Sequence, residues 1–282
     1  SHLVYAADER ARAATFGADS PEIAAWRDIF TRHDGRMPRF PLDLGLAPGE
    51  KAPVRIVERD LLSKELTAAF DAACKAAGAR MSSGIFAAVG ITDFELAGNT
   101  DYFGITVLST RHHGDYAQSQ GWFVNFAPVA FEVAGNDTFS DVAVLAHRGF
   151  EQAKQIAEAP VHAALGALAA DGTLGSELAV SPNMLSYIDF RWFPGVGRDA
   201  DTRAEHFTGE GSTSNASMWI NRDGEHLYLV AQTPDTEVAA AAVKRYHDHL
   251  AHVLETIARE GDYSLTLDDL VQEPAGAGHL DH

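Results

Sequence analysis

Two of the places where histidine and aspartate lie close together in this sequence of 282 residues have the residue types for acid–base chemistry. Residues 31–35 read Thr-Arg-His-Asp-Gly, and residues 111–115 read Arg-His-His-Gly-Asp. A histidine can act as a general base when it lies within hydrogen-bond reach of the proton that it removes. The first run ends a predicted helix, which favours a solvent-facing helix end closed by Gly35. The second run follows a predicted strand and favours a turn, although a contact with a functional site stays open.

Three other patterns indicate no complete site. His249 and His252 are three residues apart on one helical face and could form a metal pair, but no cysteine or third ligand lies nearby, which favours a polar helix face. The run 195–197 is too short for a phosphate loop. Residues 209–212 lack the strand–turn–helix setting of a hydrolase nucleophile. We therefore predict no metal site and no catalytic residue in these segments.

Composition excludes several classes of partner. The chain has 22 Lys and Arg against 40 Asp and Glu, a net charge of −18 that argues against binding to nucleic acid or anionic membranes.

Cys74 is the only cysteine, which excludes an internal disulfide and favours a reducing compartment. Its apolar helical neighbours favour a buried thiol. We find no apolar run of about 18 residues, as a membrane helix needs, and no signal-peptide pattern. We therefore expect a cytoplasmic protein without a transmembrane segment.

The elements that would position a site centre on the run 121–133, which is rich in β-branched and aromatic residues. Asn125 and Pro128 interrupt it, since a buried amide needs hydrogen-bond partners and proline removes a donor from the ladder. Gly121 allows a close approach of the backbone. Further strands are predicted at 102–111 and 184–193, at about 54–60, and in a hairpin over 217–232 with Asp-Gly at its turn.

Helices alternate with these strands. Ser20 and Pro21 start a helix whose apolar face contains Ile23, Trp26, Ile29 and Phe30. Other helices are predicted from caps at Ser63, at Thr138 and at either Asp235 or Thr236, over 82–97 and over 164–170. The fold class is therefore α/β, a mixed sheet flanked by helices. We expect one folded unit over residues 1–271 and a flexible tail over 272–282.

The pattern Gly-x-Phe-Val-Asn-x-x-Pro-Val of residues 121–129 resembles the Gly-x-Phe-x-Asn-Thr-x-Pro segment of condensation domains in peptide synthetases and of polyketide-associated acyltransferases. Residues 102–111 are similar to the preceding strand of this family, which ends in an arginine. Residues 181–190 resemble a later strand loosely. The tryptophan helix and residues 35–45 resemble the section after the catalytic motif of the acyltransferases. The resemblance implies a chloramphenicol acetyltransferase-like fold.

This family uses a His-His-x-x-x-Asp-Gly motif in its N-terminal subdomain, and no histidine here has that spacing. The resemblance therefore implies a C-terminal subdomain that is inactive without the missing N-terminal subdomain and its general-base histidine. The whole enzyme would move a fatty or polyketide acyl group from CoA or a carrier protein to a hydroxyl of a glycolipid precursor, such as a trehalose derivative. The alternatives are a peptide synthetase condensation fragment and a non-catalytic module that binds a carrier protein. No cofactor is implied, and the donor would be acyl-CoA or acyl-phosphopantetheine.

The resemblance places Arg111, Gly121 and Asn125 at the substrate tunnel or the subdomain interface, where Arg111 and Asn125 mostly hold local structure. The loop 194–215 resembles the family's latch, which crosses to the other subdomain. Without that partner sheet, we expect the loop to be mobile, refolded or exchanged between chains.

Overall fold

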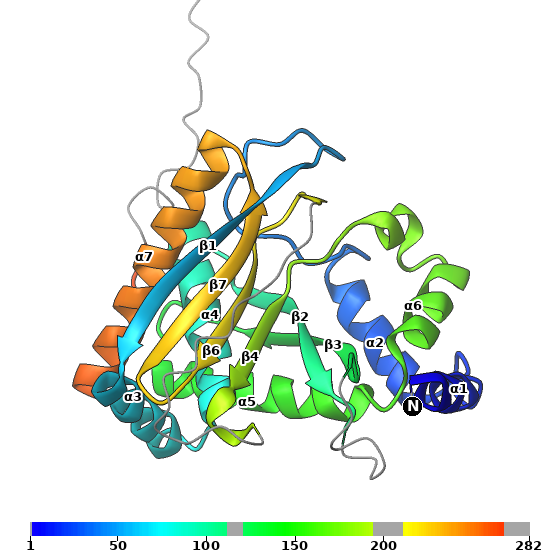
Figure 1. Ribbon diagram of the computed structural model, residues 1–282, viewed down its shortest axis with the longest axis horizontal. Coiled ribbons are helices and arrows are strands. Elements are labelled where there is room, and N and C mark those ends of the chain that lie inside the picture. Colours follow the sequence, from blue (N-terminus) through cyan, green and yellow to red (C-terminus); the bar gives the residue numbers. More distant parts are fainter. Residues whose placement is uncertain (1, 112–120, 194–210, 268–282) are drawn as a thin grey trace, which may run out of the picture.

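The computed structural model describes residues 2–111, 121–193 and 211–267. His112, His113, most of the predicted latch loop 194–215 and the tail 272–282 lie outside the described residues. Helices and strands alternate along the chain as predicted (Figure 1). The helices are α1 (His2–Ala13), α2 (Pro21–Arg32), α3 (Lys64–Ala76), α4 (Met81–Ala97), α5 (Phe139–Ile156), α6 (Val161–Ala170) and α7 (Glu237–Glu260), with short helices η2 (Gly175–Ala179) and η3 (Phe190–Trp192).

A five-stranded mixed sheet has the order β4-β6-β7-β1-β5. Its strands are β1 (Ala52–Ser63), β4 (Leu185–Asp189), β5 (Ser212–Thr213), β6 (Ser217–Arg222) and β7 (His226–Pro234). β4 and β6 run parallel, whereas the other pairs are antiparallel. α3 and α7 pack against β1 and β7. The predicted fold class, a mixed sheet flanked by helices, is confirmed.

The predicted strands 102–111 and 121–133 do not join that sheet. They form β2 (Asp101–Ser109) and β3 (Val124–Glu132), which pair antiparallel as a separate two-stranded sheet. One isolated bridge, from Ile105 to Met184, links β2 to the segment before β4. α5 packs on β3, which α2 and α6 also contact. Strand chemistry predicted both elements, but it carries no information on which distant strand each one joins.

The predicted strand 184–193 is too long, because β4 ends at Asp189. The Asp189 carboxylate accepts hydrogen bonds from the Arg191 backbone N–H at 3.2 Å and from Arg191 Nε at 2.8 Å, and the chain turns into η3. The predicted hairpin is confirmed as β6 and β7. At its turn, Asp223 Oδ1 accepts hydrogen bonds from the backbone N–H groups of Glu225 and His226 at 2.8 and 2.6 Å.

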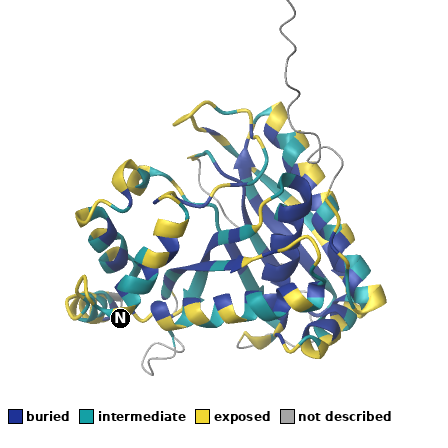
Figure 2. Cartoon of the chain, turned by 180° about the vertical axis from the view of Figure 1, so that it is seen from behind, coloured by how far each residue is buried: buried dark blue, intermediate teal, exposed yellow. Residues whose placement is uncertain are grey.

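The centre of the core is α4, which is buried along almost its whole length (Figure 2). Gly84 faces α3 so closely that an added Cβ would lie 2.2 Å from Cys74 Sγ. Cys74 is fully buried, as predicted, and burial raises the pKa of its thiol to about 12. None of the helices in the described ranges combines the length and the apolarity needed to cross a membrane.

Candidate functional site

Two of the residues that the sequence singled out, Arg111 and Gly121, lie together. Arg111 Nη2 donates a hydrogen bond to the Gly121 carbonyl oxygen at 2.7 Å. Its guanidinium also lies over the Phe123 ring, 4.8 Å from the centroid. Gly121 has φ 142°, a conformation that side-chain-bearing residues rarely adopt. The end of β2 is thereby tied to the segment that leads into β3.

α1 closes over this junction. The rings of Tyr5 and Phe123 pack edge to face with centroids 4.8 Å apart, and Tyr5 Oη lies 2.7 Å from Thr110 Oγ1. Tyr5 and Phe123 are both buried. The N-terminal helix is therefore held at the end of the β2–β3 pair by a packed aromatic contact and a buried hydroxyl hydrogen bond.

Asn125 supplies the hydrogen bonds at the turn between α5 and α6. Its amide nitrogen donates to the carbonyl oxygens of Ala157 and Ala159 at 2.8 and 2.9 Å, and its Oδ1 accepts from the Val161 N–H at 2.9 Å. The side chain is only 1% exposed. These groups lie at the end of α5 and the start of α6, where helices leave backbone groups unpaired. Asn125 therefore fixes the path of this turn.

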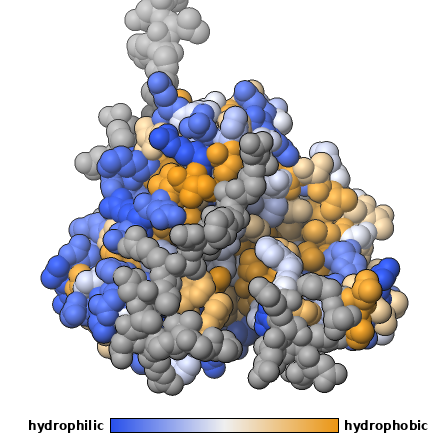
Figure 3. All heavy atoms as spheres, viewed as in Figure 1, coloured by the Kyte–Doolittle hydropathy of each residue, from blue (hydrophilic) through white to orange (hydrophobic). Residues whose placement is uncertain are grey.

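Two pockets lie near this turn. One, of about 390 Å³, is lined by Ser109, Thr110, Asn125 and Ala157 together with charged side chains such as Arg12 and Lys154. The other, of about 320 Å³, lies among α2, α6, η2 and the β2–β3 pair, and its lining is almost entirely apolar. Figure 3 shows apolar side chains gathered on this part of the surface, beside α6. The lining residues are Trp26, Phe30, Met37, Ile105, Phe126, Val161, Leu165, Leu178, Val180, Pro182 and Met184.

His33 was predicted to face solvent, and this is wrong. Gly35 does close α2 as predicted, since its N–H donates to Phe30 O at 2.8 Å with φ 67°. The His33 side chain, however, is only 15% exposed, because its ring stacks on Phe103 with centroids 4.2 Å apart. Its Nε2 lies 3.5 Å from the Asp101 carboxylate. A contact between α2 and β2 therefore turns the helix end inward.

The histidines of α7 are also engaged. His249 Nε2 lies 2.6 Å from Oε2 of the fully buried Glu95, and the same oxygen accepts from Tyr263 Oη at 2.9 Å. The ring of His252 lies 6.3 Å from that of His249. In the part of the chain that the structure describes, no group of three histidine, cysteine or acidic side chains could hold a metal ion.

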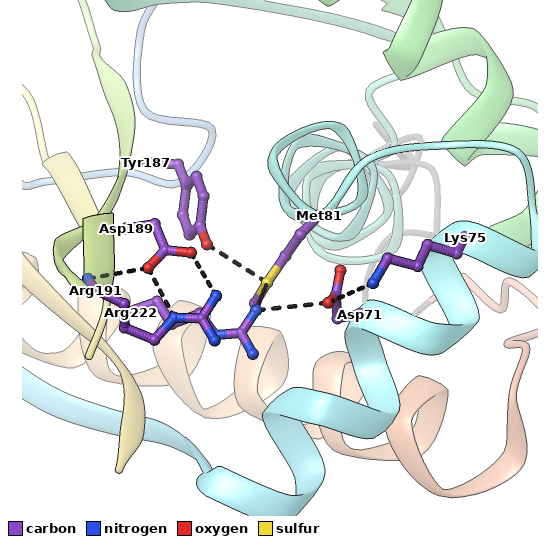
Figure 4. A network of polar contacts seen from close by, with 7 residues as sticks. All are labelled: Asp71, Lys75, Met81, Tyr187, Asp189, Arg191 and Arg222. Atoms are coloured by element: carbon purple, nitrogen blue, oxygen red, sulfur yellow. Dashed lines mark hydrogen bonds and ion pairs between the residues drawn. The ribbon is translucent and has the colours of Figure 1, made fainter. Parts of the chain in front are cut away.

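A polar network that the sequence did not reveal ties the sheet to α3 and α4 (Figure 4). Arg222 Nη1 donates to Met81 Sδ at 3.0 Å and lies 3.7 Å from the Asp71 carboxylate, which also pairs with Lys75 at 2.9 Å. Tyr187 Oη donates to the same sulfur at 3.4 Å. Arg222 is largely buried, so its charge requires this compensation. The network fits a structural role at the ends of β4 and β6.

Known proteins similar to this chain include two curated acyltransferases. The chain is 30% identical over 263 residues to acyltransferase PapA3 of Mycobacterium tuberculosis (strain CDC 1551 / Oshkosh), a match that covers 88% of this chain and 52% of PapA3. It is 27% identical over 245 residues to trehalose-2-sulfate acyltransferase PapA2 of Mycobacterium bovis (strain BCG / Pasteur 1173P2), covering 83% of this chain and 49% of that protein. The chain thus spans about half the length of these relatives. No protein-family model matches the sequence.

Solved structures give the fold. A PapA2 acyl transferase structure superposes with a TM-score of 0.75 at 24% identity, covering 90% of this chain and 55% of that one. The first condensation domain of the calcium-dependent antibiotic synthetase, in complex with a substrate analogue, superposes with a TM-score of 0.62 at 16% identity, covering 93% and 55%. The described part of the chain therefore has the fold of part of a condensation domain.

Proposed function

Because this chain is a homologue of the polyketide-associated PapA acyltransferases and has the condensation-domain fold, we propose that it is the acyl-binding part of an acyltransferase. The whole enzyme moves a fatty or polyketide acyl group to a hydroxyl of a glycolipid precursor. Acyl-CoA or an acyl-phosphopantetheine carrier is the donor. A trehalose derivative is the acceptor, in keeping with the name of the PapA2 relative.

The apolar pocket among α2, α6 and the β2–β3 pair carries this proposal. Each methylene group moved from water into such a pocket contributes about 0.8 kcal/mol, so a long acyl chain gains several kilocalories per mole. Met37 and Met184 give the lining two flexible side chains that adapt to chains of different shape. Leu178, at the edge of the pocket, is 49% exposed and leaves an apolar entrance on the surface.

We expect a dibrominated stearate to quench the fluorescence of Trp26, because this side chain lines the pocket. Titration should show saturable quenching in the wild-type chain. Trp26→Phe should abolish most of the saturable component, whereas Trp122→Phe, at a side chain that is 70% exposed, should retain it. Val161→Trp, which fills the pocket, should weaken binding at least tenfold. Saturable quenching that survives Trp26→Phe would place the acyl chain elsewhere and overturn the proposal.

The general base is proposed to be a histidine of the other subdomain, as the family motif implies. Proton removal needs that histidine within hydrogen-bond reach of the acceptor hydroxyl. The His33–Asp101 pair lies at the end of the β2–β3 pair opposite to Asn125.

The isolated chain should therefore form no acyl-sugar from acyl-CoA and trehalose 2-sulfate, whereas the PapA2 relative serves as the positive control. Mass spectrometry of the sugar products measures this directly. Turnover by the purified chain that is lost in His112→Ala or His113→Ala would show that the base lies within this chain. That result would refute the proposal that the general base belongs to the other subdomain.

A further inference from the structure

Two of the four tryptophans of this chain are more than half exposed, which is unusual for a side chain that proteins mostly bury. Trp122, in the segment that leads into β3, is 70% exposed, and Trp192, in η3, is 63% exposed. Phe193, directly after η3, is 48% exposed. Large apolar side chains that gather on one surface mark a contact with another protein or with a membrane.

The directions of the strands place these aromatic side chains at the same end of the molecule. β2 and β4 run parallel at the bridge from Ile105 to Met184, so their C-terminal ends point the same way (Figure 1). β3 runs antiparallel to β2, so the segment 121–123 lies at the end where β2 finishes. η3 follows β4 at that end too. Both aromatic segments can therefore contact one extended surface.

Charged groups beside these aromatic side chains are paired. Arg191, next to Trp192, forms an ion pair with Asp189, from Nη2 to Oδ2 at 2.6 Å (Figure 4). At the same end of the main sheet, Lys64 at the start of α3 pairs with Glu225 in the hairpin turn at 3.0 Å. Charges that are paired cost less to move away from water than isolated charges do. These pairs therefore leave the aromatic rings as the main feature that a partner would meet here.

We propose that this end of the molecule rests on the surface of a lipid bilayer whose head groups carry no net charge. Trp122 and Trp192 lie at the level of the head groups, where the apolar body and the polar N–H of a tryptophan are both accommodated. Phe193 reaches the boundary of the acyl chains. The net charge of −18 repels an anionic bilayer, so the partner is a zwitterionic one.

A bilayer suits two separate aromatic segments better than a protein does, because a protein interface needs a matching shape over its whole core. The contact itself does not depend on acyl transfer. It adds one consequence that rests on the proposed function: an acylated glycolipid precursor partitions into the same surface, which brings it to the enzyme.

Sedimentation of the whole chain with phosphatidylcholine vesicles tests this. The wild type should pellet with the vesicles in proportion to the lipid added, and Trp122→Ala with Trp192→Ala should weaken this binding at least tenfold. Because the contact is apolar, a change from low to high salt should alter the wild-type affinity by less than about twofold. Replacing half of the lipid with phosphatidylglycerol should weaken binding at low salt.

Val238→Ala is the matched control, since Val238 is 49% exposed but lies at the start of α7, beside the other end of β7. It should bind vesicles like the wild type. Circular dichroism and stearate quenching at Trp26 should be unchanged in the double tryptophan variant, which separates loss of the lipid contact from loss of the fold and from the acyl pocket.

Three results would overturn the proposal. The first is equal vesicle binding, or none, for the wild type and the double tryptophan variant. The second is binding that requires phosphatidylglycerol and disappears in high salt, which would show a contact driven by charge. The third is self-association of the wild type that the double variant loses, without vesicle binding, which would assign this surface to a protein contact.

Discussion

Asn125→Leu should lower the free energy of unfolding by about 3 kcal/mol or more, although leucine has nearly the same size as asparagine. The change removes all three hydrogen bonds of the buried amide and leaves the Ala157 and Ala159 carbonyl oxygens and the Val161 N–H without their partner. Each buried backbone group left unpaired costs about 1–3 kcal/mol, part of which local rearrangement recovers. Urea unfolding followed by circular dichroism measures the difference.

Asn136→Leu is a suitable control, because Asn136 is an exposed loop residue and the same substitution there should stay within about 0.5 kcal/mol. If Asn125→Leu lowers the free energy of unfolding no more than Asn136→Leu does, the role given to the Asn125 hydrogen bonds is contradicted. The variant also has a functional readout. Since the turn fixed by Asn125 carries Val161 into the apolar pocket, stearate quenching should weaken even under conditions where the chain stays folded.

Asn125 also shows how far the sequence leads. An amide within a β-rich apolar run must find hydrogen-bond partners, and this much followed from the residue types alone. Its partners are backbone groups 32 to 36 residues further along the chain, beyond a helix. Local patterns located α2 to α7, several of their caps and most strand positions, but not α1. They did not separate the β2–β3 pair from the main sheet, because strand pairing depends on contacts distant in sequence.

A polar pocket of about 400 Å³ at the C-terminal end of α2 was not predicted, for a related reason. The net charge of −18 is a property of the whole chain and does not reveal that Arg32, Arg36 and Arg39 follow one another closely around the end of α2. The sequence predicted the end of that helix correctly. It did not place Asp101 and Phe103 against it, and those contacts turn an ordinary helix terminus into the wall of a pocket.

Two buried side chains should give the stability of this protein opposite responses to pH. Burial lowers the pKa of His247 to about 4 from an ordinary value of 6.5. As the pH falls, the unfolded chain therefore protonates this histidine before the folded chain does. The contribution of neutral His247 to the free energy of unfolding is complete above pH 6.5 and is lost as the pH falls towards 4. The difference in pKa corresponds to about 3 kcal/mol. In His247→Gln, this part of the acid sensitivity should disappear.

Asp93 acts in the other direction. Burial raises the pKa of its carboxyl group to about 7 from 3.8, more than the hydrogen bond from Tyr246 lowers it. Between these values the folded chain holds a proton that the unfolded chain has released, so the contribution of Asp93 to stability declines as the pH rises towards 7. Asn keeps an oxygen that accepts the Tyr246 hydrogen bond. Asp93→Asn should therefore be more stable than the wild type at pH 8, by up to about 4 kcal/mol, with little advantage at pH 4.

The measurement is the free energy of unfolding from urea titrations between pH 4 and pH 8 for the wild type, each single variant and the double variant. The free energy of unfolding of the wild type should change little across this range, because the effects of His247 and Asp93 offset each other. His247→Gln should lose stability as the pH rises, and Asp93→Asn should lose it as the pH falls. The double variant should have a flatter profile than either single variant. Parallel profiles for all four proteins would show that neither group has a shifted pKa in the folded chain.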